Sequence, residues 1–186
     1  MNELYTERLI LRPWDLSDAE SLCEYAKNPN VGPVAGWPVH TSIENSSEII
    51  KTVFANEETY AVCLKTDNVP IGCIAITIGA RSNMKLPDDE GEIGYWIGEP
   101  FWGLGLIPEA CMELIRHGFG DLKLKRLWCG YFEGNEKSRR AQEKCGFVYH
   151  HTNKDMYWEL MDDIRTEHVT VLEPLAGCFS GAESRL

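Results

Sequence analysis

The residues best suited to chemistry lie in one stretch, residues 91–110, which reads GEIGYWIGEPFWGLGLIPEA. Gly103 and Gly105 allow a tight turn whose backbone can approach a ligand closely. Pro108 suits the first turn of a helix, and Glu109 complements the positive end of that helix. Such a corner directs several unpaired backbone N–H groups at one point, which is a suitable site for a phosphate group.

Two common phosphate-binding motifs do not fit this stretch. Pro108 breaks the dinucleotide pattern G-x-G-x-x-G, and no Gly-Lys-Ser or Gly-Lys-Thr follows to make a P-loop. A strand, a glycine turn and a helix are also a frequent plain connection. Phosphate binding and a simple connection therefore both remain open on this stretch alone.

Composition narrows the function classes. The 186 residues suit one domain with a sizeable core. A formal charge of −11 disfavours nucleic-acid partners, because non-specific binding to nucleic acids depends on surplus Lys and Arg. The acidic surface favours cationic partners such as amines, although acidity also serves solubility. No apolar run approaches the roughly 18–20 residues of a membrane helix, and residues 1–9 lack the features of a signal peptide.

The 7 cysteines are odd in number and form no C-x-x-C pair. They indicate reduced, buried thiols in a cytoplasmic protein, rather than a disulfide framework or a zinc site. His150 and His151 also lack ligands at zinc spacing. We therefore expect no metal. The acidic run at residues 88–90 reads as a solvated loop, with attraction of a cationic substrate as the alternative.

Apolar patterning predicts an α/β chain in which hairpins precede one crossover helix that joins parallel strands, giving a mixed sheet with helices on both faces. Ser17 and Glu20 form a capping box that predicts a helix start at Asp18. Residues 147–151 and 156–160 read as two separate strands. No repeat or linker divides the chain, so we expect a single domain over residues 1–172 and a C-terminal tail over 173–186 whose composition favours disorder.

Four motifs in order resemble the GNAT superfamily of acetyl-CoA-dependent N-acetyltransferases. Within it they are similar to the RimJ/RimL-like branch, the ribosomal-protein N-terminal acetyltransferases. The motifs are TERLILRP at 6–13, EIGYWIG at 92–98, WGLGLI at 102–107 in place of the R/Q-x-x-G-x-G/A loop, and N-x-x-S followed by EKCGF at 135–147. The resemblance covers roughly residues 5–172. It implies a GNAT-like fold, with a mostly antiparallel sheet of about seven strands splayed between strands 4 and 5.

Three positions depart from the pattern of the superfamily. Trp102 replaces the usual Arg or Gln, and Ile107 replaces a small residue whose place a branched side chain could crowd. Gln142 stands where many members carry a tyrosine that acts as general acid. In such a loop the phosphates are held mainly by backbone N–H groups, so the changes of side chain at positions 102 and 107 are tolerable.

The resemblance implies acetyl-CoA as co-substrate and a set of residues that bind it. Backbone groups near Ile97 would pair with the pantetheine arm as an added strand does. Amides of residues 103–107 would bind the pyrophosphate, and one of them, or the Gly98 amide, would polarise the thioester carbonyl. The implied cofactor-binding residues are Trp96, Ile97, Gly98, Trp102, Gly103, Leu104, Gly105, Leu106, Ile107, Asn135 and Ser138.

Two residues are the catalytic candidates that the resemblance implies. Glu92 would accept the proton of the amine, directly or through water, with Glu90 as a weaker alternative. Ser138 would donate to the leaving thiolate, with Asn135 orienting it or the cofactor. Simpler roles remain open, because Glu92 could be a surface carboxylate at a strand end and Asn135 could be a helix cap.

The implied activity is transfer of an acetyl group from acetyl-CoA to a primary amine, by direct attack in a ternary complex. The acceptor would be a protein N-terminal α-amine or a small-molecule amine. The alternative is a non-catalytic acyl-CoA-binding or regulatory module on the same fold, which Gln142 and Ile107 permit. We expect a monomer or homodimer with no nucleic-acid or membrane partner.

Overall fold

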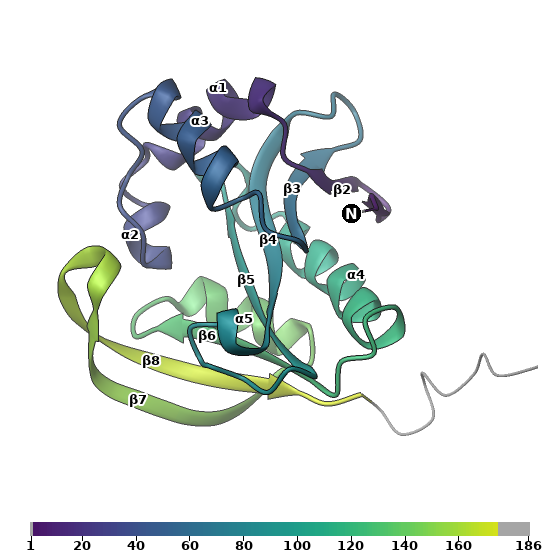
Figure 1. The fold of residues 1–186 in the computed structure, drawn as a ribbon, viewed down its shortest axis with the longest axis vertical. Coiled ribbons are helices and arrows are strands. Elements are labelled where there is room, and N and C mark those ends of the chain that lie inside the picture. Colours follow the sequence, from purple (N-terminus) through teal and green to yellow (C-terminus); the bar gives the residue numbers. More distant parts are fainter. Residues whose placement is uncertain (1, 175–186) are drawn as a thin grey trace, which may run out of the picture.

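The computed structural model describes residues 2–174 and arranges their strands in one eight-stranded sheet, in the order β1-β2-β3-β4-β5-β6-β8-β7 (Figure 1). Neighbouring strands are antiparallel except β5 and β6, which are parallel. The mixed, mostly antiparallel sheet predicted from the sequence is confirmed. The strands are β1 (Leu4–Tyr5), β2 (Leu9–Pro13), β3 (Thr59–Leu64), β4 (Pro70–Ile78), β5 (Glu90–Ile97), β6 (Arg126–Phe132), β7 (Val148–Trp158) and β8 (Asp163–Leu172).

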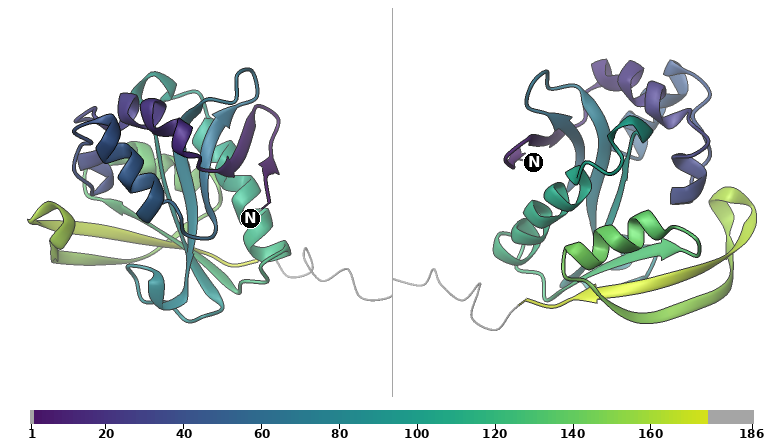
Figure 2. Two further views of the ribbon diagram at one scale, coloured as in Figure 1. Left: turned by 45° about the horizontal axis from the view of Figure 1, so that its top comes forward. Right: turned by 180° about the vertical axis from the view of Figure 1, so that it is seen from behind.

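Helices cover both faces of this sheet, as Figures 1 and 2 show. On one face α1 packs against α3 and β4, and on the other α4 and α5 pack against the central strands. The helices are α1 (Ala19–Ala26), α2 (Gly32–Ala35), α3 (Ile43–Thr52), α4 (Leu106–Gly120) and α5 (Glu136–Lys144), with short 3-10 turns η1 (Leu16–Asp18), η2 (Gly79–Arg81), η3 (Glu99–Phe101) and η4 (Glu159–Met161).

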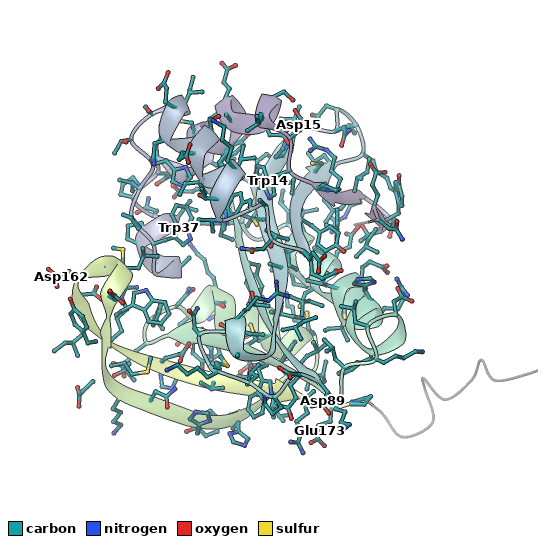
Figure 3. All side chains as sticks on the ribbon, viewed as in Figure 1. Trp14, Asp15, Trp37, Asp89, Asp162 and Glu173 are labelled. Carbon is teal, nitrogen blue, oxygen red and sulfur yellow. The ribbon has the colours of Figure 1, made fainter. Side chains whose placement is uncertain are left out.

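The main core lies between α4 and the central strands. The buried positions of α4 include Ala110, Cys111, Leu114 and Ile115, whose spacing of three and four residues puts them on one helical face. A second, smaller core lies under α1 and α3. There Trp14 stacks on Phe54 with ring centroids 4.8 Å apart, and Figure 3 shows Trp14 beneath the two helices.

The first helical segment differs from the prediction. Asp15, not Ser17, is the N-cap: its side chain accepts from the Ser17 amide, and Asp18 completes a capping box with the Asp15 backbone. The turn η1 then leads into α1, which begins at Ala19. The predicted start at Asp18 with Ser17 as cap was wrong, because the Ser17 hydroxyl donates to Asp15 Oδ1 at 2.6 Å and accepts from no helix amide within residues 2–174.

Two strand predictions also change. The two-residue strand β1 pairs with β2 and adds an eighth strand to the sheet. The pieces predicted at 147–151 and 156–160 form one strand, β7, because β-bulges at Tyr149/His151 and Asn153/Met156 disturb the register without ending the ladder. Of the predicted tail at 173–186, residues 175–186, which include Cys178, lie outside the described residues.

The hairpin of β7 and β8 reaches back to α2, and Figure 2 shows it extending away from the rest of the sheet. Trp158 Nε1 donates to the Gly36 carbonyl at 2.7 Å, and Arg165 Nη1 donates to the Pro33 carbonyl at 2.8 Å. These two bonds join segments that are far apart in the sequence. They fix α2 above the ends of β5 and β6.

Candidate active site

A cavity opens where β5 and β6 separate. The two strands pair at three positions, from Glu90 opposite Arg126 to Glu92 opposite Trp128, and no pair joins them beyond Glu92 in the described chain. From there β5 remains paired with β4, whereas β6 remains paired with β8. The cavity between the two half-sheets has a volume of about 920 Å³, and the β5 edge beside it lacks a strand partner.

The corner after β5 directs free amides into this cavity. Gly103 and Gly105 adopt left-handed backbone conformations, with φ of 77° and 76°, and α4 begins at the next residue. Within residues 2–174, no backbone N–H of residues 103–107 donates a hydrogen bond. Gly103, Gly105, Leu106 and Ile107 line the cavity. Unbonded amides at the positive end of a helix are a suitable site for a phosphate anion.

Residues near the N-terminus hold this corner from behind. Glu109, in the first turn of α4, accepts from Thr6 Oγ1 at 2.5 Å and from the Arg8 amide at 2.7 Å, and its other oxygen pairs with Arg8 Nε at 2.6 Å. Arg8 Nη1 also donates to the Leu104 carbonyl at 3.1 Å. Partial burial opposes ionisation of Glu109, but the bonds from Thr6 and Arg8 outweigh it and lower its pKa. The motif at 6–13 therefore positions the loop.

The structure bears on three of the predicted cofactor-binding residues. The Ile107 side chain is buried in the main core and leaves the corner open. The Leu104 side chain is exposed and does not line the cavity. The Gly98 amide donates to the Ile71 carbonyl at 2.8 Å, and Gly98 is also outside the lining. That amide is therefore not available to polarise a thioester.

Trp102 connects the end of β5 to α5. Its Nε1 donates to the Ile97 carbonyl at 2.9 Å, and the Lys137 ammonium lies 3.4 Å from its ring centroid. The cation over the aromatic face is a favourable contact. Trp102, Ile97 and Trp96 all line the cavity, so this wall is built where the sequence placed it.

Ser138 lies in the cavity wall at the centre of a hydrogen-bond network. Its Oγ is 3.0 Å from Tyr95 Oη and accepts from Gln142 Nε2 at 3.1 Å. Asn135 Oδ1 accepts from the Ser138 amide at 3.1 Å, which makes Asn135 the N-cap of α5. Asn135 lines the cavity as well. The arrangement fixes the hydroxyl of Ser138 at the side of the splay that α5 covers.

Two members of this network escaped the sequence analysis as functional groups. Gln142 is buried, accepts from Thr170 Oγ1 at 2.7 Å and donates to the Gly130 carbonyl at 3.0 Å, so it links α5 to both β8 and β6. Burial raises the pKa of Tyr95 well above its ordinary value. The tyrosine is a neutral partner for Ser138. Tyr95 lies two residues from both Ile93 and Ile97 on β5, so its side chain shares a face with theirs. This period of two is the sequence pattern from which its position could have been predicted.

Glu92 also lines the cavity, anchored by the turn after η2. One carboxylate oxygen, Oε2, accepts from Ser82 Oγ at 2.6 Å and from the Asn83 amide at 3.1 Å. Burial raises the pKa of Glu92, and these hydrogen bonds only partly oppose the effect. A half-buried carboxylate with a raised pKa beside a cavity is suited to accept a proton.

Glu90 lies elsewhere. Trp128 Nε1 donates to its carboxylate at 2.5 Å and Arg126 Nη1 at 3.3 Å, and Glu90 does not line this cavity. Asp89 pairs with Lys125 at 2.5 Å. Figure 3 shows Asp89 next to Glu173 at one end of the sheet. This part of the acidic run is thus paired, away from the splay, which argues against a role in attracting substrate.

The chain matches the family described as "Acetyltransferase (GNAT) domain" over residues 8–148. It belongs to the GNAT acetyltransferase family. The uncharacterized N-acetyltransferase p20 of Bacillus licheniformis is 30% identical over 132 residues, which is 68% of this chain and 71% of that protein. YdaF of Bacillus subtilis, which carries the provisional name of a ribosomal N-acetyltransferase, is 42% identical over 66 residues, 36% of each chain. The resemblance to the GNAT superfamily is thereby confirmed.

Solved structures share the fold of this GNAT acetyltransferase. A GNAT-family acetyltransferase from Bacillus anthracis has a TM-score of 0.77 at 19% identity, covering 92% of this chain and 98% of its own. The ribosomal-protein-S5-alanine acetyltransferase from Vibrio fischeri has a TM-score of 0.71 at 20% identity, covering 93% and 97%. These likenesses support the GNAT-like fold.

Residues 2–174 contain no helix with the length and apolar character that crossing a membrane requires. The same residues contain no group of three or more His, Cys, Asp or Glu side chains placed to hold a metal ion. The described cysteines are free thiols, and all but Cys23 are buried.

Proposed function

We propose that this acetyltransferase transfers the acetyl group of acetyl-CoA to a primary amine by direct attack, with both substrates bound in the cavity at once. The acceptor is a protein N-terminal α-amine or the amine of a small molecule. The observation that carries the proposal is the corner at residues 103–107, whose unbonded amides open onto a cavity beside an unpaired strand edge. The names of YdaF and of the Vibrio fischeri enzyme support the protein acceptor.

Charge on α5 supports coenzyme A as the occupant of this corner. Lys137, Arg140 and Lys144 line the cavity, and none of them forms an ion pair within residues 2–174. Their spacing of three and four residues puts them on one helical face. In a chain of formal charge −11, three unpaired cations at one end of a cavity are suited to a ligand with several phosphate groups.

Each catalytic candidate has a role in the transfer. An acceptor that arrives as an ammonium gives one proton to Glu92, directly or through water. The neutral nitrogen then attacks the thioester carbon, so that a C–N bond forms and the C–S bond breaks. Coenzyme A leaves as a thiolate, which Ser138 stabilises by hydrogen bonding. The nitrogen, now bonded to the acetyl carbon, loses its second proton, the thiolate takes up one proton and becomes the thiol, and the proton accepted by Glu92 is released to solvent.

The network around Ser138 suits this role. Gln142 donates to Ser138 Oγ, and Tyr95 Oη lies within hydrogen-bond distance of it. Tyr95 Oη also lies 3.2 Å from the Ser138 carbonyl, and its one hydrogen can go to either acceptor. When it donates to Ser138 Oγ, both lone pairs of the serine oxygen are engaged. The hydroxyl hydrogen of Ser138 is then left to point at the leaving sulfur. Ser138 would in this way supply the hydrogen bond to the leaving group that a tyrosine supplies in many superfamily members, where this chain has Gln142.

Deprotonation costs differ between the two acceptor classes. A terminal α-amine, with a reference pKa of about 7.7–8.0, needs about 1–1.4 kcal/mol to become neutral at pH 7, whereas a lysine-like alkylamine needs about 4.6 kcal/mol. A general base accelerates proton transfer by about 10²–10⁴-fold. Glu92 is therefore sufficient for an α-amine and helpful for an alkylamine.

The test measures thiol release from acetyl-CoA with a panel of amines, beside calorimetric binding of coenzyme A. The panel pairs each free-N-terminus peptide with the same peptide blocked at its N-terminus, and adds simple alkylamines. We expect coenzyme A to bind and at least one free amine to react, while blocked peptides stay unchanged. Binding without turnover of any amine would instead identify a non-catalytic acyl-CoA-binding module, the alternative that Gln142 permits. Absence of binding would refute the cofactor site.

A further inference from the structure

The half of the cavity away from α5 carries negative charge. Glu92 on β5 pairs with Trp128 on β6, and Phe132 on β6 pairs with Glu167 on β8. Paired residues, and residues two apart on a strand, point to the same face of a sheet. Glu92, Gly130 and Glu167 therefore share one face, and all three line the cavity.

Glu167 is buried and only partly hydrogen-bonded. Its relative exposure is 8%, Asn153 Nδ2 donates to Oε2 at 3.3 Å, and Oε1 accepts no hydrogen bond within residues 2–174. A Cβ on Gly130 would lie 2.3 Å from Oε1, so the carboxylate rests directly against the bare backbone of β6. Burial raises the pKa of Glu167, and Glu92 raises it further against the opposing bond from Asn153. Such a group gains from a cation placed beside it.

Within residues 2–174, no basic side chain lines this half of the cavity. The basic residues that line the cavity are those of α5, on the opposite face of the sheet. Arg165 lies over the Phe132 ring at 4.6 Å, but it is held by Asp163 at 2.8 Å and does not line the cavity. Trp96, Phe132 and Trp158 supply aromatic walls. Aromatic faces and carboxylates together suit an ammonium group.

We propose that Glu167 is a specificity-determining residue that makes the acceptor site select cationic amines: it rejects amines with an acidic group near the nitrogen and favours those with a second positive centre. The inference rests on the proposed function and names the acceptor class of the same site. A zwitterionic amino acid would bring its carboxylate towards Glu92 and Glu167. Repulsion of this kind discriminates between substrates of equal size.

The test uses three acceptors with the same four-carbon chain: 1,4-diaminobutane, butylamine and 4-aminobutanoate, whose net charges at pH 7 are +2, +1 and 0. We expect kcat/KM of the wild-type protein to fall in that order. Glu167→Gln should reduce the ratio of kcat/KM for 1,4-diaminobutane to kcat/KM for 4-aminobutanoate by roughly tenfold, because one carboxylate no longer contributes to the discrimination. The KM for acetyl-CoA should not change. The ratio compares substrates on one protein, so a partial loss of folded enzyme does not alter it.

Two variants accompany this measurement. Gly130→Ala should displace the Glu167 carboxylate and narrow the ratio too, even if Glu167→Gln folds poorly. Glu136→Gln removes an equal charge from the cavity lining on α5 and should keep the wild-type ratio. Turnover of amines with no charge order, or with a ratio that Glu167→Gln leaves unchanged, would overturn this inference alone. Failure of every amine and peptide to react would overturn the proposed function and this inference together.

Discussion

Replacement of Glu92 by Gln should lower activity while making the fold more stable. Gln keeps an oxygen that can accept from Ser82 Oγ and the Asn83 amide, so the anchoring geometry is preserved. It removes the proton acceptor, which contributes about 10²–10⁴-fold to a rate. We expect kcat for an alkylamine to fall by about that factor at pH 7. The loss for an α-amine should be smaller, because deprotonation costs it about 3 kcal/mol less.

The effect on stability has the opposite sign. Burial raises the pKa of Glu92 in the folded chain above that of the unfolded chain. Ionisation therefore favours the unfolded chain as pH rises above the unfolded pKa, and the penalty becomes complete above the folded pKa. Glu92→Gln removes this penalty, so Tm should rise at pH 7. Below both pKa values the carboxyl is protonated in either state, and the gain should disappear.

The assay follows kcat from about pH 6 to pH 9, with Tm measured at pH 7 and in acid. The rate loss in Glu92→Gln should be greatest at low pH and shrink as the free amine becomes abundant. Glu90→Gln is the matched control, because Glu90 is buried on the same strand but bonded to Trp128 outside the cavity. That variant should keep the wild-type profile. A pH–rate profile that Glu92→Gln leaves unchanged would remove Glu92 from the mechanism.

Three further predictions concern the corner and α5. Ser138→Ala should lower kcat by roughly tenfold or more with little change in the KM for acetyl-CoA, since it removes a donor to the leaving group; an altered KM alone would indicate a binding role. Gly105→Ala and Gly146→Ala both place an alanine in a left-handed backbone conformation, which costs each variant about 1–2 kcal/mol of folding stability. Calorimetry should show weaker coenzyme A binding only for Gly105→Ala, because only Gly105 lies in the corner at residues 103–107. Lys144→Gln should weaken coenzyme A binding several-fold at low salt and less at high salt; a salt-independent loss would contradict a charge role.

The sequence was sufficient for the order of the elements and for the corner at residues 103–107, because glycines, caps and apolar periodicity are local signals. It failed where a distant group decided the outcome. The amide of Gly98 looked free until β4 placed the Ile71 carbonyl opposite it. Residues 152–155 separated two predicted strands, but the ladder with β8 carries β7 through a bulge.

The missed site residues share the same cause. Glu167 stands in a strand with no motif around it, and its position beside Glu92 depends on two successive strand pairings. The sequence marked Gln142 only as a replacement for a tyrosine. In the structure its side chain is buried and its hydrogen bonds join α5 to β6 and β8. Long-range register, which local patterns do not encode, determined both.

The short contact between β5 and β6 has a consequence for how such a protein can change its chemistry. Three residue pairs join two half-sheets that are otherwise braced independently, one by β4 and the other by β8. The proposed coenzyme A site lies beside α4 and α5. The opposite side of the cavity is enclosed by α2 and the tip of the β7–β8 hairpin. Mutations in that hairpin can therefore change the acceptor amine while the proposed coenzyme A site stays intact. Related proteins could in this way acquire different acceptors and keep acetyl-CoA as their common co-substrate.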